Sequence, residues 1–431
     1  MIKKTIFLLF LILPLYGQNI LSVEEAIKIG LKNNFDIRIA RNSVEIADNN
    51  RGKGAAGFMP TFDASANAGI SKTDEDTNSP FSFGSITTKN YSGSLMMNWT
   101  LFDGFKMFVN KKKYDELAEL GYEQARNQIE TSVVQIMRAY YNVVQQRQLL
   151  DVAKDNLEIS KSRLEKEKVR GNIGGASSTD LLNARVVYNV DRATLLNQEL
   201  QVEIADKNLN ISLGRDPLDS VMVQKEINID FLELEYDEIL DLAFERNSII
   251  AASLKNKEIA DKDISLTKSV FYPRISLNGS TTYGDRNINR SAGGEITSTS
   301  VNYQGALQLS WNLFNGMQNA IDVQNAKIQR KNARINYEKT KNFIAGLVRE
   351  KYNTYKKRIK LMNLERENVE AARQNLERQQ ERYELGTTTS LDYRDAQIKL
   401  LRAQANYITS RYQARISRLE IDQLTGNLAI K

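Results

Sequence analysis

Asp392 and Asp395 are the residues whose type and spacing first suggest chemistry. They lie three positions apart at the start of a stretch rich in helix-forming residues, so both carboxylates face the same side of a helix. Such a pair could serve a hydrolase, or it could simply complement the positive end of the helix dipole. The chain has no histidine and no cysteine, which excludes thiol nucleophiles, disulfides, imidazole or thiolate metal sites and histidine acid–base chemistry. An enzyme could still use carboxylates or lysines, but the usual catalytic groups are few. We expect no enzyme, no metal site and no cofactor.

An internal duplication sets the elements that position these acids. Phe58-Met59-Pro60 returns as Phe271-Tyr272-Pro273, and Trp-x-Leu-Phe-x-Gly begins at both Trp99 and Trp311. A glycine followed six residues later by an aspartate occurs at 174–180 and again at 386–392. Landmarks that keep their order and spacing predict one large architecture built twice. We expect a first repeat at residues 18–217 and a second at 218–431.

Residues 1–17 are typical of a secretory signal peptide. Lys3 and Lys4 precede an apolar run from Ile6 to Leu15, and Gly17 is a small residue at the expected cleavage site. No later stretch contains the ~20 apolar residues that a membrane-spanning helix needs. The formal charge of +6 comes from interspersed acids and bases, which gives little support to nucleic-acid binding. The exported protein is therefore free in solution or crosses a membrane as β-strands.

Two stretches without proline predict very long helices. They run from about Lys106 to Arg170 and from about Met317 to Leu385, and each would be ~100 Å long at 1.5 Å per residue. Returning helices are expected at 177–212 and 389–424. A seven-residue apolar series in the second long stretch indicates left-handed supercoiled packing, either in a hollow cylinder of helices or in a plain coiled-coil rod. Its members are Tyr355, Met362, Val369, Leu376 and Tyr383.

Two segments, Tyr91–Phe102 and Tyr303–Leu313, alternate apolar and polar residues as amphipathic strands do. Their expected partners are Thr61–Ser71 and Arg274–Tyr283, with polar loops at 72–89 and 284–301. The strands have about the 9–11 residues that a membrane-crossing strand needs, although soluble hairpins with one buried face show the same alternation. Aromatic residues at the strand ends would suit the two membrane–water interfaces: Tyr91, Trp99, Phe102, Tyr303, Trp311 and Phe314.

The reversals between long and returning helices contain glycine followed by hydroxyl side chains. Gly174 and Gly386 relieve the backbone where one helix ends and the chain turns. Ser178 and Thr389 are among the candidates for the N-cap of the returning helix. An exposed, repeated tip is either a well-capped helical hairpin or, in addition, a docking surface.

This order of elements resembles the TolC-type outer-membrane efflux proteins. The similarity covers the whole mature chain and rests on Leu21–Ala26 with Asn33-Asn34, the paired Trp-x-Leu-Phe-x-Gly motifs and the two tip turns. It implies a mixed α and β membrane protein, a homotrimer with a 12-stranded β-barrel continued by a long α-helical periplasmic tunnel. It also implies an outer-membrane exit duct of a Gram-negative tripartite efflux or type I secretion system. Such a duct passively conducts substrates that an inner-membrane transporter delivers through a periplasmic adaptor.

The resemblance also assigns roles to residues. Asp392 and Asp395 match acidic residues that line the periplasmic constriction, and Tyr383 and Asp180 match positions that hold the entrance closed. The tips around Gly174, Ser178, Gly386 and Thr389 would contact the adaptor. Thr388 stands where relatives often have an arginine of the closing network.

Two alternatives belong to other classes of protein. A periplasmic coiled-coil adaptor or scaffold would use the long helical hairpins, and an exported hydrolase would use the carboxylates. The duplicated amphipathic strands count against the adaptor, because an adaptor has no use for a lipid-facing surface. No cluster of acids outside helical faces supports the hydrolase.

Overall fold

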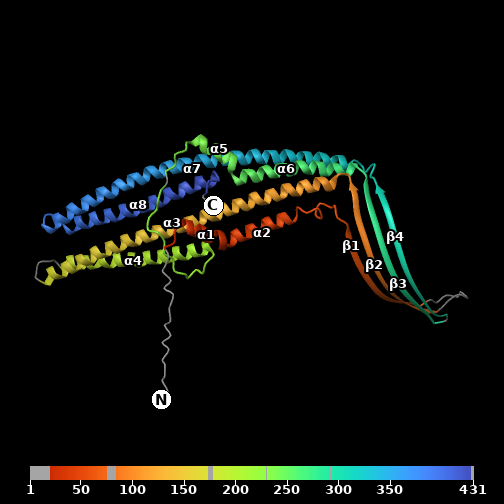
Figure 1. The fold of residues 1–431 in the computed structure, drawn as a ribbon. Helices are drawn as coiled ribbons and strands as arrows, with labels where there is room; N and C mark the ends of the chain where they lie inside the picture. The colour runs from red at the N-terminus through yellow and green to blue at the C-terminus, as the bar shows by residue number, and fades with distance from the viewer. Residues whose placement is uncertain (1–19, 75–83, 173–177, 230, 292, 429–431) are drawn as a thin grey trace, which may run out of the picture. The chain divides into compact units, whose positions relative to one another are not determined.

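The computed structural model describes residues 20–428 except 75–83, 173–177, 230 and 292, so the expected signal peptide lies outside the described residues. The same order of elements occurs twice along the chain: two short helices, a β-hairpin, a long helix and a returning helix (Figure 1). The first set comprises α1 Val23–Asn33, α2 Phe35–Asn49, β1 Thr61–Asp74, β2 Ser85–Asp103, α3 Lys106–Asn172 and α4 Ser178–Leu213. The second comprises α5 Tyr236–Arg246, α6 Ser248–Lys268, the 3-10 turn η1 Ser269–Phe271, β3 Arg274–Arg290, β4 Gly294–Ser310, α7 Gln318–Glu384 and α8 Ser390–Leu424.

The chain forms two compact units, and each takes segments from both halves of the sequence. One unit, the described residues of 20–40, 127–247 and 344–428, contains the tips of the long helices and the returning helices. The other, residues 41–126 and 248–343, contains the sheet and the remaining helical segments. The corresponding parts of the two halves therefore pack with each other, which suits a duplicated chain.

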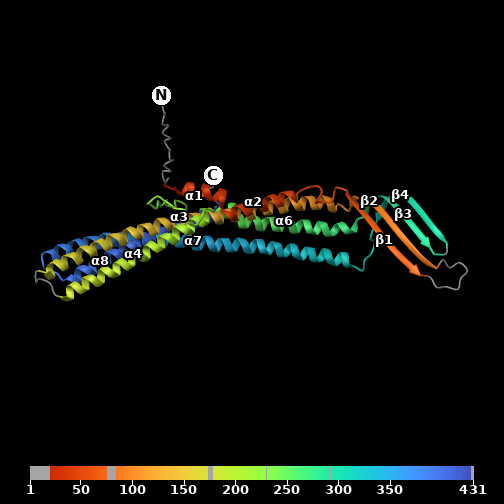
Figure 2. The same ribbon diagram turned by 90° about the horizontal axis from the view of Figure 1, so that it is seen from below.

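The predicted long helices are confirmed, and their ends fall within two residues of the expected positions. Each of α3 and α7 has 67 residues, and α4 and α8 begin and end close to the predicted bounds. In the helical unit, α3, α4, α7 and α8 lie alongside one another (Figures 1 and 2). Uninterrupted helix-forming sequence without proline is sufficient to explain their length.

The short helices hold the ends of the returning helices in the same way in both halves. The side-chain amide of Asn34 donates to the carbonyl of Ser212 at 2.8 Å, and that of Asn247 donates to the carbonyl of Leu424 at 3.1 Å. Both carbonyls belong to last turns, where helix carbonyls lack an internal partner. Gly214 follows with a φ of +68°, and a Cβ there would lie 2.5 Å from the Asn33 carbonyl oxygen. These contacts give Asn34, Asn247 and Gly214 a structural role at the ends of the returning helices.

The four strands form one antiparallel sheet in the order β1-β2-β3-β4 (Figure 2). The strands are longer than the sequence predicts: β3 continues to Arg290 and β4 begins at Gly294, so the expected loop at 284–301 is wrong apart from a tight turn. Lys72–Asp74 and Ser85–Lys89 are also paired strand. These segments are mainly polar on both faces, and such polarity predicts loops. Threonine favours strands, however, and directly opposite polar residues can pair.

Candidate functional site

The sheet has one apolar face, as predicted. Directly paired residues point to the same side of a sheet, and the register aligns Trp99 with Leu277 and Leu307, and Ile275 with Leu309. The alternate positions of the strands carry mainly serine, threonine, asparagine and glutamine. The apolar face is uncovered, with Leu307 69% exposed. A sheet of this kind needs an apolar environment on one side and water on the other.

The two tryptophans make the same hydrogen bond in the two halves. The indole Nε1 of Trp99 donates to the carbonyl of Phe58 at 3.0 Å, and that of Trp311 donates to the carbonyl of Phe271 at 3.0 Å. Each indole thereby satisfies its only polar group while its ring stays accessible. The other predicted interface aromatics Tyr91, Tyr303 and Phe314 are exposed, and Phe102 is half-buried.

Trp311 lies outside the strand that the sequence predicts to carry it. Strand β4 ends at Ser310, so Trp311 and Phe314 belong to the connection between β4 and α7. The alternation of apolar and polar residues continues beyond Ser310 into this connection. The sequence pattern therefore does not show where β4 ends. The bond from Trp311 to the carbonyl of Phe271 holds the connection next to the start of β3.

The Trp-x-Leu-Phe-x-Gly motif forms the connection from strand to long helix. Gly104 and Phe105 have φ values of +70° and +69°, and Gly316 and Met317 have +67° and +70°. Two successive residues in the left-handed region reverse the chain sharply, and only the first is a glycine, which adopts this conformation without strain. Asp103 then accepts a hydrogen bond from the backbone of the first helical turn at 3.0 Å.

The second tip turn is built as predicted. Gly386 has a φ of +71° after the last turn of α7, and Thr389 is the N-cap of α8, accepting from the backbone N–H of Asp392 at 3.1 Å. Asp392 completes the capping box by accepting from the Thr389 backbone N–H at 3.4 Å. Its carboxylate also accepts a hydrogen bond from the Thr389 hydroxyl at 2.6 Å. This hydrogen bond holds the pKa of Asp392 below its ordinary value. Gly174 and the side chain of Ser178 at the first tip lie outside the described residues.

The two aspartates of the predicted constriction have different surroundings. Asp392 is engaged in the capping box, whereas Asp395 pairs with Lys399 one turn along α8 at 2.6 Å. Both partners of the latter pair are exposed, so the ion pair contributes little to stability. The lysine still offsets part of the negative charge on this face of α8.

Tyr383 contacts an acid that the sequence did not indicate. Its hydroxyl donates to Glu167 Oε1 at 2.7 Å, and its ring stacks on Tyr393 with centroids 5.3 Å apart. A phenol has one proton to donate, so Asp180 of the same chain is not its acceptor here. Burial first, and then the bond to Glu167, raise the pKa of Tyr383. Asp180 is half-buried in the first turn of α4.

Two further links join the helical hairpin of the first half to that of the second. Arg394 on α8 donates to both carboxylate oxygens of Asp191 on α4 at 2.9 and 3.3 Å, and the two side chains are only 14% and 4% exposed. Arg163 on α3 donates to the Ser390 hydroxyl. Sequence reasoning missed these residues because charged side chains on long polar helices carry no local sign of burial.

No helix within the described part of the chain is long and apolar enough to cross a membrane. Among the same residues, no three histidine, cysteine or acidic side chains are grouped so that they could hold a metal ion.

Comparisons with known proteins identify the family. The sequence profile of the outer membrane efflux proteins matches residues 26–215 and 239–427, which correspond to the two halves. The outer membrane protein TolC of Escherichia coli strain K12 is 23% identical over 352 residues, 80% of this chain and 71% of TolC. The outer membrane efflux protein BepC of Brucella suis is 21% identical over 402 residues, 92% of this chain and 83% of BepC.

Solved structures share the fold. The Campylobacter jejuni CmeC outer membrane channel superposes with a TM-score of 0.74 at 18% identity, covering 94% of this chain and 85% of that one. The open state of the Neisseria gonorrhoeae MtrE outer membrane channel has a TM-score of 0.72 at 18% identity, covering 94% and 88%. With its family profile matched in both halves, the chain belongs to the outer membrane efflux protein family and is a TolC-type exit duct of the outer membrane.

Proposed function

We propose that three copies of this chain close one 12-stranded barrel and conduct export substrates passively through it. The observation that carries this proposal is the four-stranded sheet with one apolar face and two edges, β1 and β4, that have no partner strand among the described residues. Lipid tolerates no open sheet edge, and four strands are fewer than the eight of the smallest membrane barrels. Three copies with four strands each supply a closed barrel of even strand number.

A contact inside the chain indicates how copies meet. The ring of Phe105, after β2, packs edge-to-face on Tyr272, before β3, with centroids 5.7 Å apart. Met317 corresponds to Phe105 and Met59 corresponds to Tyr272 in the duplicated sequence, and both methionines are exposed. A surface that joins the first half to the second can therefore join the second half to the first half of the next copy. Such head-to-tail contacts close into a ring.

The helical part serves as a periplasmic tunnel in this proposal. Helices of 67 residues extend ~100 Å from the sheet connections. The tips around Gly174, Ser178, Gly386 and Thr389 dock onto a periplasmic adaptor, which connects the duct to an inner-membrane transporter. The assembly serves either tripartite efflux or type I secretion.

The entrance is proposed to be narrow and acidic. Asp392 and Asp395 of three copies would form two rings that favour cations, with Lys399 weakening the second ring. Tyr383 and Asp180 help to keep the entrance closed, and the bond from Tyr383 to Glu167 supports this role within one copy. The alternative of a periplasmic adaptor or scaffold leaves the apolar face of the sheet without a purpose.

Thiol cross-linking tests the assembly, because the chain has no cysteine of its own. Met59→Cys combined with Met317→Cys should give covalent trimers in outer-membrane fractions treated with a short bis-maleimide. The matched pair Phe105→Cys and Tyr272→Cys should react within one chain and give no higher species. A protein that stays monomeric in the soluble periplasmic fraction would refute the proposed function.

A further inference from the structure

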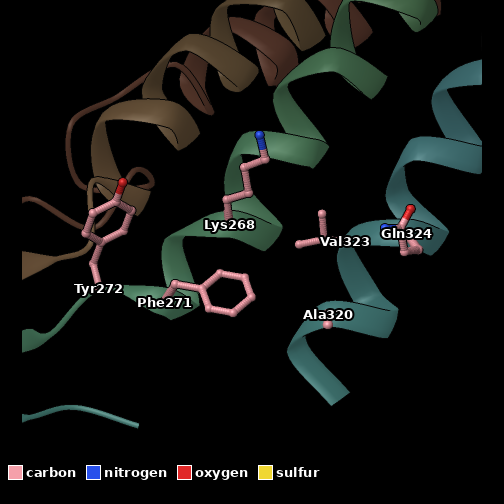
Figure 3. Close-up of a pocket in the computed structure, with 6 residues that line it drawn as sticks. All are labelled: Lys268, Phe271, Tyr272, Ala320, Val323 and Gln324. Carbon is pink, nitrogen blue, oxygen red and sulfur yellow. The ribbon is translucent and has the colours of Figure 1, made fainter. Parts of the chain in front are cut away.

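A hollow lies between the end of α6 and the start of α7, within the unit that contains the sheet (Figure 3). Its volume is about 370 Å³, within the ~300–1,000 Å³ that small-molecule sites occupy. Figure 3 shows the Phe271 ring extending from the end of α6 and η1 toward the helix that carries Ala320 and Val323. The lining residues are Lys268, Phe271, Tyr272, Ala320, Val323 and Gln324.

The first half of the chain shows what this space lacks. Phe58 corresponds to Phe271, and Phe108 corresponds to Ala320. In the first half the two phenylalanine rings meet edge-to-face with centroids 5.1 Å apart. In the second half alanine replaces the second ring, and Phe271 remains about half exposed. The hollow therefore includes the space that an aromatic ring fills in the first half, and it is larger than one ring because it opens to solvent.

The chemistry of the lining selects an amphiphile with an anionic end. Phe271 and Val323 offer an apolar wall on which a hydrocarbon chain gains free energy by leaving water. Lys268 lies one turn before Phe271, on the same side of the helix. It is exposed, and within the described chain no carboxylate pairs with it. The first half has Ala55 at the position of Lys268 and Lys112 at the position of Gln324, so its corresponding cation lies on the other helix, beside a space that Phe108 fills.

The position of the hollow points to a lipid as the source of that amphiphile. Trp311, one of the proposed interface aromatics, donates its indole N–H to the carbonyl of Phe271 at 3.0 Å, and β3 begins three residues later at Arg274. Interfacial tryptophans lie at the level of the lipid headgroups. Phe271 also lines the hollow. The hollow therefore lies at the level of the lipid headgroups, where a lipid phosphate is available.

We propose that the hollow holds one anionic phospholipid per chain, with the phosphate on Lys268 and the first methylenes of an acyl chain against Phe271 and Val323. This inference rests on the proposed function, since it places the start of β3 at the membrane surface. The lipid would fill the space that Phe108 fills in the other half, and it would tie α6 to α7 beside the connection that leads from the barrel.

Native mass spectrometry of the detergent-purified assembly, titrated with dioleoyl phosphatidylglycerol, tests the site. The wild-type protein should retain one lipid per chain saturably. Lys268→Gln should weaken retention about fivefold, because a lysine near an anionic lipid contributes about that factor. Ala320→Phe should abolish retention by restoring the missing ring.

Each other outcome overturns the lipid site. Retention that Lys268→Gln and Ala320→Phe leave unchanged, or equal retention of phosphatidylethanolamine, would show that the lipid binds elsewhere or without charge selection. If the wild type binds no lipid and the Ala320→Phe variant fails to assemble, a neighbouring copy of the chain fills the hollow instead of a lipid. The same spectra count the chains, so a trimer without lipid refutes only this site, whereas a monomer refutes the proposed function.

Discussion

Replacing Tyr383 by phenylalanine should loosen the entrance that we propose to be closed, by an amount that follows from the contacts of the Tyr383 hydroxyl. The change removes the one hydrogen bond that the hydroxyl donates to Glu167. That carboxylate is 3% exposed, so water cannot readily take the place of the lost donor. A hydrogen bond to a charged group is worth ~1.5–3 kcal/mol. Arg170 remains 3.6 Å from Glu167, which favours the lower end of the range. A difference of ~1.4 kcal/mol is a factor of ten in an equilibrium constant. The equilibrium between the closed and open forms of each copy should therefore shift toward the open form by about 10- to 100-fold.

A double-mutant cycle read in planar bilayers measures this contribution and identifies the acceptor. Tyr383→Phe should lengthen the open time of single channels, and Glu167→Ala should add little to it, since both changes remove the same bond. Tyr383→Phe and Asp180→Ala should instead act additively. Heat-resistant trimer serves as the control for assembly. Coupling to Asp180 without coupling to Glu167 would refute this assignment and favour the closing bond that the family resemblance implies.

Further changes at the tip test the remaining assignments. Arg394→Gln leaves the buried charge of Asp191 without its partner, which should cost about 3–5 kcal/mol and increase proteolysis at the tip, and adding Asp191→Asn should restore most of the resistance. Asp392→Asn with Asp395→Asn should reduce cation preference in reversal-potential measurements, and an unchanged preference would mean that both acids are only solvated residues at a helix start. Because the pKa of Asp392 is lowered in the folded chain, its capping contribution is complete above the ordinary pKa of 3.8 and is lost as the pH falls through the lower folded value. Amide exchange at the start of α8 should therefore rise only in strong acid, and a rise near neutral pH would contradict the sign. Gly386→Val places a β-branched residue at a φ of +71°, which should strain the reversal by about 1–3 kcal/mol and weaken adaptor cross-linking while trimers persist; unchanged cross-linking and export would count against docking at this tip.

The sequence determines the elements whose signals are local. The lack of proline between Lys106 and Asn172 and the run of helix formers predict α3 almost to its ends. The alternation in β2 predicts which face is apolar, because side-chain direction in a strand depends only on residue parity. Thr389 is predictable as an N-cap because its bond joins residues three apart. The pair of Asp395 and Lys399 is also local, and the spacing of four residues would have revealed it.

Tertiary structure decides the features that depend on which segments lie side by side. Tyr383 and Glu167 are 216 residues apart, and Asp191 and Arg394 are 203 apart. On polar helices of this length many acids and bases are equivalent in sequence, and only the packing of one helix against another buries a particular pair. The extent of β3 and β4 is of the same kind, because hydrogen bonds to the neighbouring strand stabilise segments whose composition resembles loop. Periodicity along the chain therefore fixes which residues form a helix or a strand, whereas the partners of buried charges are set by contacts between distant segments.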